Sequence, residues 1–403
     1  MWALSRSYQI PPTRVSRLFA RPCRSFSTSA HLARSEHHTG TTRPRVAVLY
    51  QELDPPLING VRKPKKPGYK DSGADIAYVL VHHCGLDVVT PSSSPDPAND
   101  SDWVFGDTES GIISAVERKA THLWANTVLF ANHPLQTSGK LDEVAKHLKI
   151  VGQPPKLVEL YDDKNYVNGL LRAKGYFRLP PAQLVRNEQE LEHVLSKRRP
   201  YPVVGKPVRG RGSHGVKVCR SNEDLLHHCK DLLSQQSSVI VEDYLPGIEG
   251  TVTVVPFKID HQRGYYALPV VERFNHIDDI APYSGAVAVM ENSRVVTREE
   301  HERDLTYIDI QQQCMEVARE LQVTAPIRID VRRISKAKSS PFAMFDVNIK
   351  PNMTGPGRPG RENQASLTAL AAAGDGSDYA DLLLRILQGS STLYDWRKVE
   401  PPK

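Results

Sequence analysis

The sequence contains no long apolar run. Its 403 residues are 39% hydrophobic and 24% charged, which is an ordinary composition for a globular protein. No uninterrupted apolar stretch approaches the roughly 20 residues that a transmembrane helix requires, so we expect a soluble protein without a membrane partner. A chain of this length exceeds one hydrophobic core of typical size, and two or three packed subdomains are therefore expected.

Cysteine pairs and the commonest nucleotide-binding signatures are also missing. The five cysteines show no CxxC spacing, which argues against a zinc site built on cysteine pairs and favours reduced thiols in an intracellular, reducing compartment. The chain has no Walker phosphate loop and no GxGxxG fingerprint that opens a helix. It also contains no internal repeats, so a repeat architecture is excluded.

Acidic residues and lysine are absent from the first 35 residues. This stretch contains six arginines and seven serines. Without those arginines the 52 basic residues fall to 46, which equals the 46 acidic ones, so the net charge of +6 gives no reason to expect a nucleic-acid partner. The composition is typical of a mitochondrial transit peptide, and we interpret residues 1–43 as a leader that directs the chain to mitochondria. The alternative is a disordered basic tail on a cytoplasmic protein.

The residues after this leader are predicted to form an α/β domain at 44–150. Residues 45–50 are a short apolar run typical of a buried first strand. Residues 71–85 have helical spacing and end at a glycine. Three more elements are a strand at 87–90, a helix at 110–119 and a strand at 123–131. The alternation of strands and helices indicates an α/β layer.

Two further units with an α+β pattern are expected after this domain. The central unit comprises residues 151–240 and the C-terminal unit residues 241–390, with 391–403 as a tail. Helices are predicted at 141–149, 162–174, 222–233, 299–321, 364–373 and 379–387. Strands are predicted at 201–206, 216–219, 239–244, 251–257, 265–271, 327–331 and 342–349.

A lysine at the end of a predicted strand precedes a glycine-rich loop. Lys206 is followed by Gly210, Gly212 and Gly215. The strand fixes the ammonium group, and glycines let backbone N–H groups approach anionic oxygens without an intervening Cβ, so this pattern favours phosphate binding. The alternative is a glycine hairpin between two strands.

Two acids flank the end of the apolar strand at 239–244. Glu242 lies at the strand end and Glu249 follows seven residues later. These carboxylates could accept hydrogen bonds from an exocyclic amine and from a ribose diol. The alternative is a strand that runs into a Pro-Gly turn with solvated acids.

Two neighbouring strands near the C-terminus carry polar side chains at alternating positions. Alternation places Arg328 and Asp330 on one strand face, and Asp346 and Asn348 on one face of the next strand. Pairing these strands as a hairpin would gather two carboxylates and an amide oxygen, which are ligands that suit Mg²⁺. The alternative is a pair of exposed polar strand faces.

In order and approximate spacing, these three signals resemble the ATP-grasp family, and most closely its D-alanine–D-alanine ligase-like branch, over residues 155–360. The resemblance implies an N-terminal Rossmann-like domain and two α+β subdomains that clamp ATP. It implies a ligase that joins a carboxylate, such as an amino acid, to an amine through an acyl phosphate. It also implies Mg²⁺ or Mn²⁺ as the metal ion, and it is compatible with a homodimer.

The same resemblance assigns roles to individual residues. Arg328 would stabilise the reacting acyl centre, and Ser213 stands in the loop where the family carries paired serines, so it is taken as catalytic and ATP-binding. The other implied roles are all in binding. The residues implied to bind the ATP phosphates are Lys164, Lys206, Gly210, Gly212 and Gly215, and those implied to bind adenine are Glu242, Tyr244 and Leu245. Glu249 is implied to bind the ribose, and the residues implied to bind the metal ion are Asp330, Asp346 and Asn348.

The chain also departs from the family pattern. Asp346 is shorter than the usual glutamate, and Lys350 opens a Gly/Pro-rich segment that differs from the family's. Arg358 and Arg361 in that segment are expected to bind a substrate carboxylate, or else to form a solvated basic loop. His133 is either a turn residue or a substrate contact. The alternative functions are carboxylation or phosphorylation of a small acid, and ATP binding by a regulatory protein without turnover.

Overall fold

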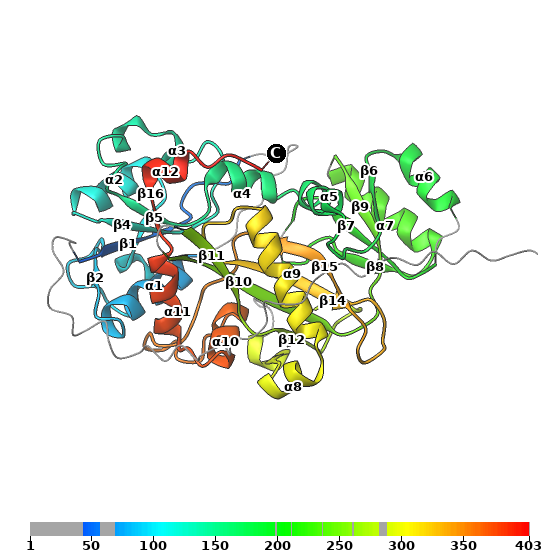
Figure 1. Ribbon diagram of the computed structural model, residues 1–403. Helices are drawn as coiled ribbons and strands as arrows, with labels where there is room; N and C mark the ends of the chain where they lie inside the picture. The colour runs from blue at the N-terminus through cyan, green and yellow to red at the C-terminus, as the bar shows by residue number, and fades with distance from the viewer. Residues whose placement is uncertain are drawn as a thin grey trace, which may run out of the picture. The chain divides into compact units, whose positions relative to one another are not determined.

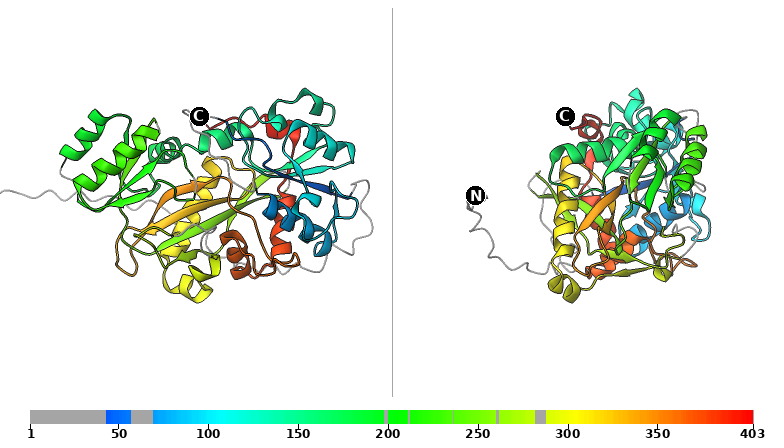
Figure 2. Two further views of the ribbon diagram at one scale, coloured as in Figure 1. Left: turned by 180° about the vertical axis from the view of Figure 1, so that it is seen from behind. Right: turned by 90° about the vertical axis from the view of Figure 1, so that its right-hand side faces the viewer.

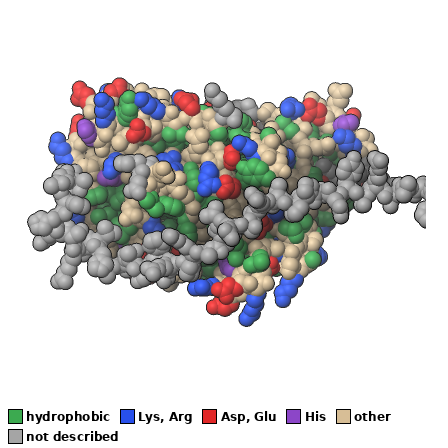
Figure 3. Space-filling model, viewed as in Figure 1, with side chains coloured by type: hydrophobic (Ala, Val, Ile, Leu, Met, Phe, Trp, Pro, Cys, Tyr) green, Lys and Arg blue, Asp and Glu red, His purple; other side chains and the backbone are tan. Residues whose placement is uncertain are grey.

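The computed structural model describes residues 43–56, 69–197, 200–210, 212–235, 237–259, 262–281 and 288–402. The predicted leader, residues 1–43, lies outside this part of the chain except for Arg43. Within the described residues, no helix combines the length and the apolar character needed to span a membrane. On the face shown in Figure 3, basic and acidic side chains of the described residues are interspersed, as expected for a near-neutral body.

The N-terminal sheet is mostly parallel (Figure 1). Strand β1 pairs in parallel with β2, β3 and β4, and β4 pairs in parallel with β5. Residues 46–49 of β1 are fully buried, as expected for a parallel strand covered on both faces. The elements of this unit are β1 (Arg45–Tyr50), α1 (Lys70–His82), β2 (Asp87–Val88), η1 (Asp100–Asp102), β3 (Val104–Gly106), α2 (Glu109–Glu117), β4 (His122–Asn126), α3 (Pro134–Thr137), η2 (Gly139–Leu141) and β5 (Lys149–Val151).

The central sheet is antiparallel and has the order β6-β9-β7-β8. Its hydrophobic core consists of residues from this unit alone. Strand β9, the last of these four along the chain, ends at Asp243, so the predicted boundary between the two units at residue 240 falls inside this strand. The elements are β6 (Ala182–Val185), α6 (Glu188–Ser196), β7 (Val203–Pro207), β8 (Lys217–Cys219), α7 (Asn222–Gln235) and β9 (Val239–Asp243).

The C-terminal sheet has the order β13-β12-β10-β14-β15, and β11 pairs with β10. Figure 2 shows α9 lying along this sheet, where it contacts β10, β11 and β15. The elements are β10 (Glu249–Ile259), β11 (Gln262–Ala267), β12 (Val271–Arg273), η3 (Val289–Glu291), β13 (Ser293–Val295), α8 (Arg298–Arg303), α9 (Thr306–Glu320), β14 (Ile327–Arg333), β15 (Phe342–Asn348), α10 (Leu367–Gly374) and α11 (Tyr379–Gln388). Two more helices, α4 (Pro155–Tyr161) and α5 (Lys164–Lys174), precede the central sheet, and α5 contacts β15.

The predicted hairpin of β14 and β15 is confirmed. The strands pair antiparallel, with Arg328 opposite Asn348 and Asp330 opposite Asp346. Side chains directly opposite each other on one face of a sheet have Cβ atoms roughly 5 Å apart. The hairpin therefore gathers the polar side chains that the alternation predicted.

The prediction of a C-terminal tail at residues 391–403 is wrong. Residues 391–392 form β16 (Ser391–Thr392), which pairs with β5 of the N-terminal sheet. The helix α12 (Leu393–Arg397) follows, and Trp396 in it is fully buried. The Trp396 indole donates to the Gly152 carbonyl oxygen at 2.9 Å. This segment is short, so its sequence carries little periodic signal, and its burial depends on a strand far away along the chain.

Two predicted helices also differ from the structure. The predicted helix 141–149 is a series of turns with i→i−3 hydrogen bonds, for example from Ala145 N to the Asp142 carbonyl oxygen at 3.3 Å. Leu141, Ala145 and Leu148 are nevertheless buried, because tight turns repeat with nearly the helical period. The predicted helix 299–321 is two helices, α8 and α9. They are separated at Asp304, whose backbone is extended and whose Oδ1 atom accepts a hydrogen bond from Thr306 N at 3.1 Å.

Burial of His122 in β4 predicts a pH-dependent stability. The side chain is 8% exposed, and this burial, with a smaller contribution from Lys149, lowers its pKa to about 4. An unfolded histidine has a pKa of about 6.5. The unfolded chain therefore takes up the proton first, and stability falls as the pH decreases through the window from 6.5 to 4.

We expect a shift from pH 7 to pH 5 to cost about 2 kcal/mol through this one residue. The measurement is urea unfolding of the wild type and His122→Gln at both pH values. Because glutamine does not titrate, the variant should lose that much less stability than the wild type on acidification. An identical pH dependence of both proteins would contradict the prediction.

Candidate active site

A cavity of about 710 Å³ is lined by residues of the central sheet, of the C-terminal sheet and of loops in the N-terminal unit. Its lining includes residues of β7 and β9, of β10, β12, β14 and β15, and Gln51 and Tyr69 of the N-terminal unit. The volume is in the range of small-molecule sites, roughly 300–1,000 Å³. All predicted site residues line it except Gly215, Arg358 and Arg361.

A buried ion pair joins β7 and β9 at this cavity. Lys206 Nζ lies 2.6 Å from Glu242 Oε1 and also donates to the Phe345 carbonyl oxygen at 2.9 Å. Both charged side chains are 3% exposed. The second carboxylate oxygen, Glu242 Oε2, is buried and accepts no hydrogen bond from the described residues. Burial raises the pKa of Glu242, and the ammonium group of Lys206 opposes that shift. This oxygen is available to accept a hydrogen bond from a ligand.

Lys164 lies at the first position of α5, whose N-terminus is capped by Asp163. Its ammonium group contacts Asp346 Oδ1 at 2.8 Å and the Gly210 carbonyl oxygen at 3.4 Å. The backbone N–H of Lys164 donates to the Val208 carbonyl oxygen at 3.1 Å. The start of α5 is thus tied both to the glycine-rich loop and to strand β15, so Lys164 presents its charge between them.

The glycine-rich loop adopts left-handed backbone conformations. Gly212 has φ 63°, Ser213 φ 58° and Gly215 φ 75°. Ser213 lines the cavity, whereas Gly215 is not among the lining residues, and a Cβ at Gly215 would lie 3.1 Å from Leu232. The positive φ and this packing both favour glycine at position 215, and its contact with a phosphate stays a prediction.

His228 in α7 holds this loop to β7. Its Nε2 atom lies 3.2 Å from the Gly205 carbonyl oxygen and 3.1 Å from the Gly215 carbonyl oxygen. Both partners are acceptors, so this nitrogen carries the proton and donates to them. One side chain thus connects the strand that carries Lys206 with the end of the loop. Periodicity along the sequence gave no signal for it.

Arg328 and Asp330 form an ion pair on the cavity side of β14. Arg328 Nε lies 3.1 Å from Asp330 Oδ1, and Thr251 Oγ1 donates to the same oxygen at 2.7 Å. The other oxygen, Asp330 Oδ2, accepts from Asn348 Nδ2 at 2.9 Å. Burial raises the pKa of Asp330, but the guanidinium of Arg328, the hydroxyl of Thr251 and the charge of Arg273 together outweigh burial, so the net shift of the pKa is downward. Asp330 is therefore held as a carboxylate.

Two carboxylates and one amide are available to a metal ion here. Among the described residues, no group of three or more His, Cys, Asp or Glu side chains could hold one. Asp330 and Asp346 lie opposite each other, and Asn348 follows on the same strand. Such a small oxygen-donor set suits Mg²⁺, which keeps several waters and takes further ligands from substrate phosphates. The residues present therefore fit this ion.

The predicted base and ribose contacts also reach the cavity. Leu245 and Tyr244 line it, and Arg332 stacks on the Tyr244 ring at 4.8 Å. Glu249 Oε2 accepts from His276 Nε2 at 2.9 Å and lies 3.7 Å from Arg332 Nη1. Glu249 therefore reaches the cavity as part of a charged cluster.

Four cationic residues that line the cavity were not predicted as site residues from the sequence: Arg209, Arg273, Arg332 and Lys350. Arg273 ends β12 opposite Glu249, and burial lowers its pKa. The predicted strand 265–271 ended two residues before the end of β12, so Arg273 was not recognised as a strand residue that faces the site. Lys350 lies two residues beyond the end of β15 and lines the cavity. It was noted only as a departure from a family pattern.

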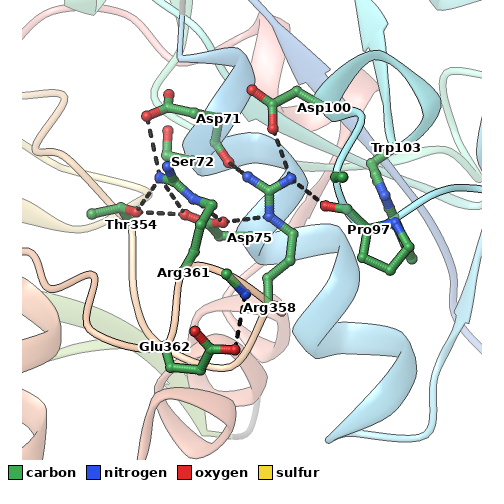
Figure 4. A network of polar contacts seen from close by, with 12 residues as sticks. Asp71, Ser72, Asp75, Pro97, Asp100, Trp103, Thr354, Arg358, Arg361 and Glu362 are labelled. Carbon is green, nitrogen blue, oxygen red and sulfur yellow. Dashed lines mark hydrogen bonds and ion pairs between the residues drawn. The ribbon is translucent and has the colours of Figure 1, made fainter.

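The prediction that Arg358 and Arg361 bind a substrate carboxylate is wrong. Figure 4 shows both guanidinium groups turned toward α1, where they bind Asp75. Arg358 Nε and Arg361 Nε lie 2.7 and 2.8 Å from Asp75 Oδ1. Arg358 is 1% exposed and also pairs with Asp100 at 2.7 Å. Both guanidinium groups donate hydrogen bonds to Asp75 of the protein. The two arginines therefore act neither as substrate contacts nor as a solvated basic loop.

His133 is a turn residue. It caps α3, where its Nδ1 atom accepts from Leu135 N at 3.1 Å. Its Nε2 atom lies 3.3 Å from Asp107 Oδ2. Asp107 is fully buried, and its other oxygen accepts from the backbone N–H groups of Glu52 and Leu53 at 2.9 and 2.8 Å. This cluster fixes the segment after β1, which borders the cavity at Gln51.

Comparison with known proteins gives three findings. The family model described as D-ala D-ala ligase C-terminus matches residues 169–388, more than half of the chain. A D-alanine–D-alanine ligase of Thermotoga sp. (strain RQ2) is 43% identical over 72 residues, which are 18% of this chain and only 22% of that enzyme. The D-alanine–D-alanine ligase of Aquifex aeolicus is 28% identical over 232 residues, covering 56% of this chain and 68% of the relative.

The fold has solved counterparts. The crystal structure of a D-alanine–D-alanine ligase from Bacillus anthracis complexed with ATP matches with a TM-score of 0.56. The match covers 89% of this chain and 99% of that one, at 17% sequence identity. At this identity the likeness is one of fold, and it confirms the predicted ATP-grasp architecture.

Proposed function

This chain belongs to the D-ala D-ala ligase C-terminus family, and on that premise we propose that it is an ATP- and Mg²⁺-dependent ligase. It would join a carboxylate, in the first place that of an amino acid, to an amine through an acyl phosphate. One observation carries the proposal: Lys206, Glu242 and Asp330, from strands of two different sheets, line a single cavity.

The proposed nucleotide site uses groups whose charges and free acceptors suit ATP. Glu242 Oε2 is the buried acceptor that would take a hydrogen bond from the adenine amino group, beside Leu245 and Tyr244. Glu249 would bind the ribose. Lys164, Lys206 and the backbone of Gly210, Gly212 and Ser213 would hold the phosphates, because ammonium groups and glycine-loop N–H groups complement anionic oxygens.

The reaction needs positioning and charge neutralisation more than a nucleophilic side chain. A carboxylate is a poor electrophile, and transfer of a phosphoryl group to it creates an acyl phosphate that an amine attacks. Lys164 and Lys206 would offset charge on the transferring group, and Arg328 would stabilise the oxyanion formed at the acyl carbon. The glycine-rich loop would close over the site and exclude water, which would otherwise hydrolyse the acyl phosphate.

Asp330, Asp346 and Asn348 would hold Mg²⁺, which would neutralise charge on the phosphate oxygens when bound. The structure supports this because Asp330 and Asp346 are now partnered by Arg328 and Lys164, cations in the place of a divalent charge. A regulatory protein that binds ATP without turnover would have no need for these acids or for Arg328. Their presence on one face of the hairpin favours an enzyme.

ADP release by the purified full chain tests the proposal. We expect Mg²⁺-dependent ADP formation with at least one pair from a panel of amino acids of both configurations. Asp330→Asn should lower the rate on the order of a hundredfold, since a bound metal ion contributes several kcal/mol to the transition state. Asp346→Asn, which leaves the Arg328–Asp330 pair in place, should do the same.

The matched control is Glu302→Gln, which removes an exposed acid paired with Arg298 and should leave the rate unchanged. ADP formation that no acid and amine pair raises above background, and that neither aspartate variant lowers, would contradict the ligase reading. ADP formation with an acid and bicarbonate, or with an acid alone, would instead support carboxylation or phosphorylation.

The leader composition supports import into mitochondria as part of this proposal. Six arginines without an acid or lysine in residues 1–35 are typical of such signals. A fusion of residues 1–43 to a fluorescent protein should accumulate in mitochondria. Replacing its arginines by glutamine should leave the fusion in the cytoplasm, and cytoplasmic fluorescence of the unaltered fusion would contradict the proposal.

A further inference from the structure

His228 of α7 lies where the hairpin of β7 and β8 opens into the glycine-rich loop. Helix α7 packs against β7 and β8, as Figure 1 shows. The last paired residues of the two strands are Gly205 and Lys217, and Gly215 lies two residues beyond that pair. Because His228 Nε2 lies within 3.2 Å of the Gly205 carbonyl oxygen and 3.1 Å of the Gly215 carbonyl oxygen, the imidazole bridges both sides of the opening.

The bridge is a single N–H group shared between two acceptors. A carbonyl oxygen only accepts hydrogen bonds, so the Nε2 atom of His228 carries the proton. One donor shared in this way forms a three-centre hydrogen bond. Removing it takes one hydrogen bond from each of the two carbonyl oxygens, and it also removes the link between strand β7 and the end of the loop.

Glycine at position 205 provides the room that the imidazole occupies. A Cβ at this position would lie 2.8 Å from His228 Cδ2, which is closer than real Cβ contacts, but 3.6 Å from Cys229 Sγ, which is an ordinary contact. Gly205 is not among the residues with positive φ, so its backbone conformation suits other residues too. The glycine is therefore explained by the imidazole, and the two residues are parts of one contact.

This contact lies on the opposite face of the sheet from the proposed phosphate site. Successive residues of a strand point to opposite faces. Position 205 faces α7, whereas Lys206 faces the cavity, where its Nζ atom lies 2.6 Å from Glu242 Oε1. His228 is not one of the described residues that line the cavity. It can therefore influence a ligand only through the backbone that it holds.

The loop is held at both of its ends. At its start the backbone N–H of Lys164 donates to the Val208 carbonyl oxygen at 3.1 Å, and at its end His228 provides the second anchor. Between the anchors, Gly212 has φ 63° and Ser213 has φ 58°. The left-handed conformation is unfavourable for serine, so a loop released at one end would relax away from it.

We propose that His228 is a positioning residue for ATP, because it holds the glycine-rich loop with the backbone of Gly212 and Ser213 presented to the phosphates. The inference rests on the proposed nucleotide site and adds to it a residue that touches no substrate. A loop that is ordered before binding loses less conformational freedom when the phosphates bind, which raises the affinity.

The test measures nucleotide binding by the full chain. Calorimetry uses Mg²⁺ and an ATP analogue with an imido bridge between its β- and γ-phosphates, and ADP release gives the KM values for ATP and for the amino acid. His228→Ala removes the donor, and His228→Gln keeps a side-chain N–H donor. Gly205→Ala displaces the imidazole through its Cβ. The matched control is His227→Ala, which changes the neighbouring exposed histidine of the same helix.

We expect His228→Ala and Gly205→Ala each to weaken binding of the analogue about five- to tenfold, which is what one hydrogen bond contributes. Both should raise the KM for ATP and leave the KM for the amino acid unchanged. His228→Gln should restore most of the affinity, and His227→Ala should bind like the wild type. In the His228→Ala background, Gly205→Ala should cause no further loss, because its Cβ then meets no ring.

Wild-type affinity of His228→Ala, absence of rescue by glutamine, or additive losses in the double variant would overturn the inference. A merely structural role would lower the folded fraction, and with it kcat and the binding stoichiometry, while Kd and both KM values stayed unchanged. That result would also overturn it.

The ligase function fails in a different way. Absence of ADP release with every amino acid would contradict that function. The binding comparison needs no turnover, so it would still decide the role of His228. A wild type that does not bind the analogue would overturn both proposals.

Discussion

Replacing Lys206 by methionine is expected to abolish ATP binding and to lower the free energy of unfolding by about 3–5 kcal/mol, as removal of one partner of a buried ion pair does. Both effects have one cause. Lys206 and Glu242 are each 3% exposed, and the variant would leave the Glu242 carboxylate buried without its counter-charge. The cavity would also lose a cation from the proposed phosphate site.

A second substitution separates stability from binding. Adding Glu242→Gln removes the uncompensated charge, so Lys206→Met/Glu242→Gln should regain most of the lost stability. It should still fail to bind ATP. Denaturant unfolding and calorimetric titration with ATP measure the two quantities. Lys217→Met, which breaks an ion pair with the partly exposed Asp224, is the control and should cost less than about 1 kcal/mol. Normal ATP affinity of Lys206→Met would contradict the assignment of this lysine.

Asparagine at position 75 should destabilise the protein by about 3–5 kcal/mol, because it removes one charge from a buried network that contains two arginines. Asp75 is fully buried and accepts hydrogen bonds from Arg358, Arg361 and Thr354. Asparagine has the same shape, but it offers one oxygen instead of two and carries no charge. Arg358, at 1% exposure, would then depend on Asp100 alone for a counter-charge.

The control for Asp75→Asn is a substitution in the exposed ion pair of Arg298 and Glu302. Glu302→Gln should change stability by less than about 0.5 kcal/mol, since exposed i,i+4 pairs contribute little. Asp75→Asn should also raise the KM for the amino acid substrate more than the KM for ATP, because Asp75 anchors the segment after Lys350. A loss of stability no larger than that of the control would show that the network does not hold this segment.

The residues that the sequence placed correctly carry a signal within a short stretch. Strand alternation places Arg328 with Asp330 and Asp346 with Asn348, and a hairpin between neighbouring strands then brings the four together. Lys206 and Glu242 are likewise recognisable at the ends of apolar runs. In each case period-two alternation and adjacency along the chain were enough to predict where the side chain lies.

Residues whose surroundings are set by distant segments could not be placed in this way. Arg358 meets Asp75, a residue 283 positions earlier in the chain, and nothing in either local pattern indicates the pairing. Trp396 is buried against Gly152 for a similar reason, 244 positions apart. An arginine on a Gly/Pro-rich loop has the same local sequence whether it binds a ligand or anchors the loop, and only the tertiary contact distinguishes the two.

In the proposed reaction a carboxylate is activated as an acyl phosphate in the cavity between Lys206 and Arg328. An isotope experiment can detect this intermediate by following ¹⁸O from the carboxylate of the acid substrate during amide formation. An acyl phosphate passes one carboxylate oxygen to the phosphate that the amine expels, so labelled phosphate should form in step with the amide product. Amide formation accompanied by unlabelled phosphate would exclude an acyl phosphate intermediate.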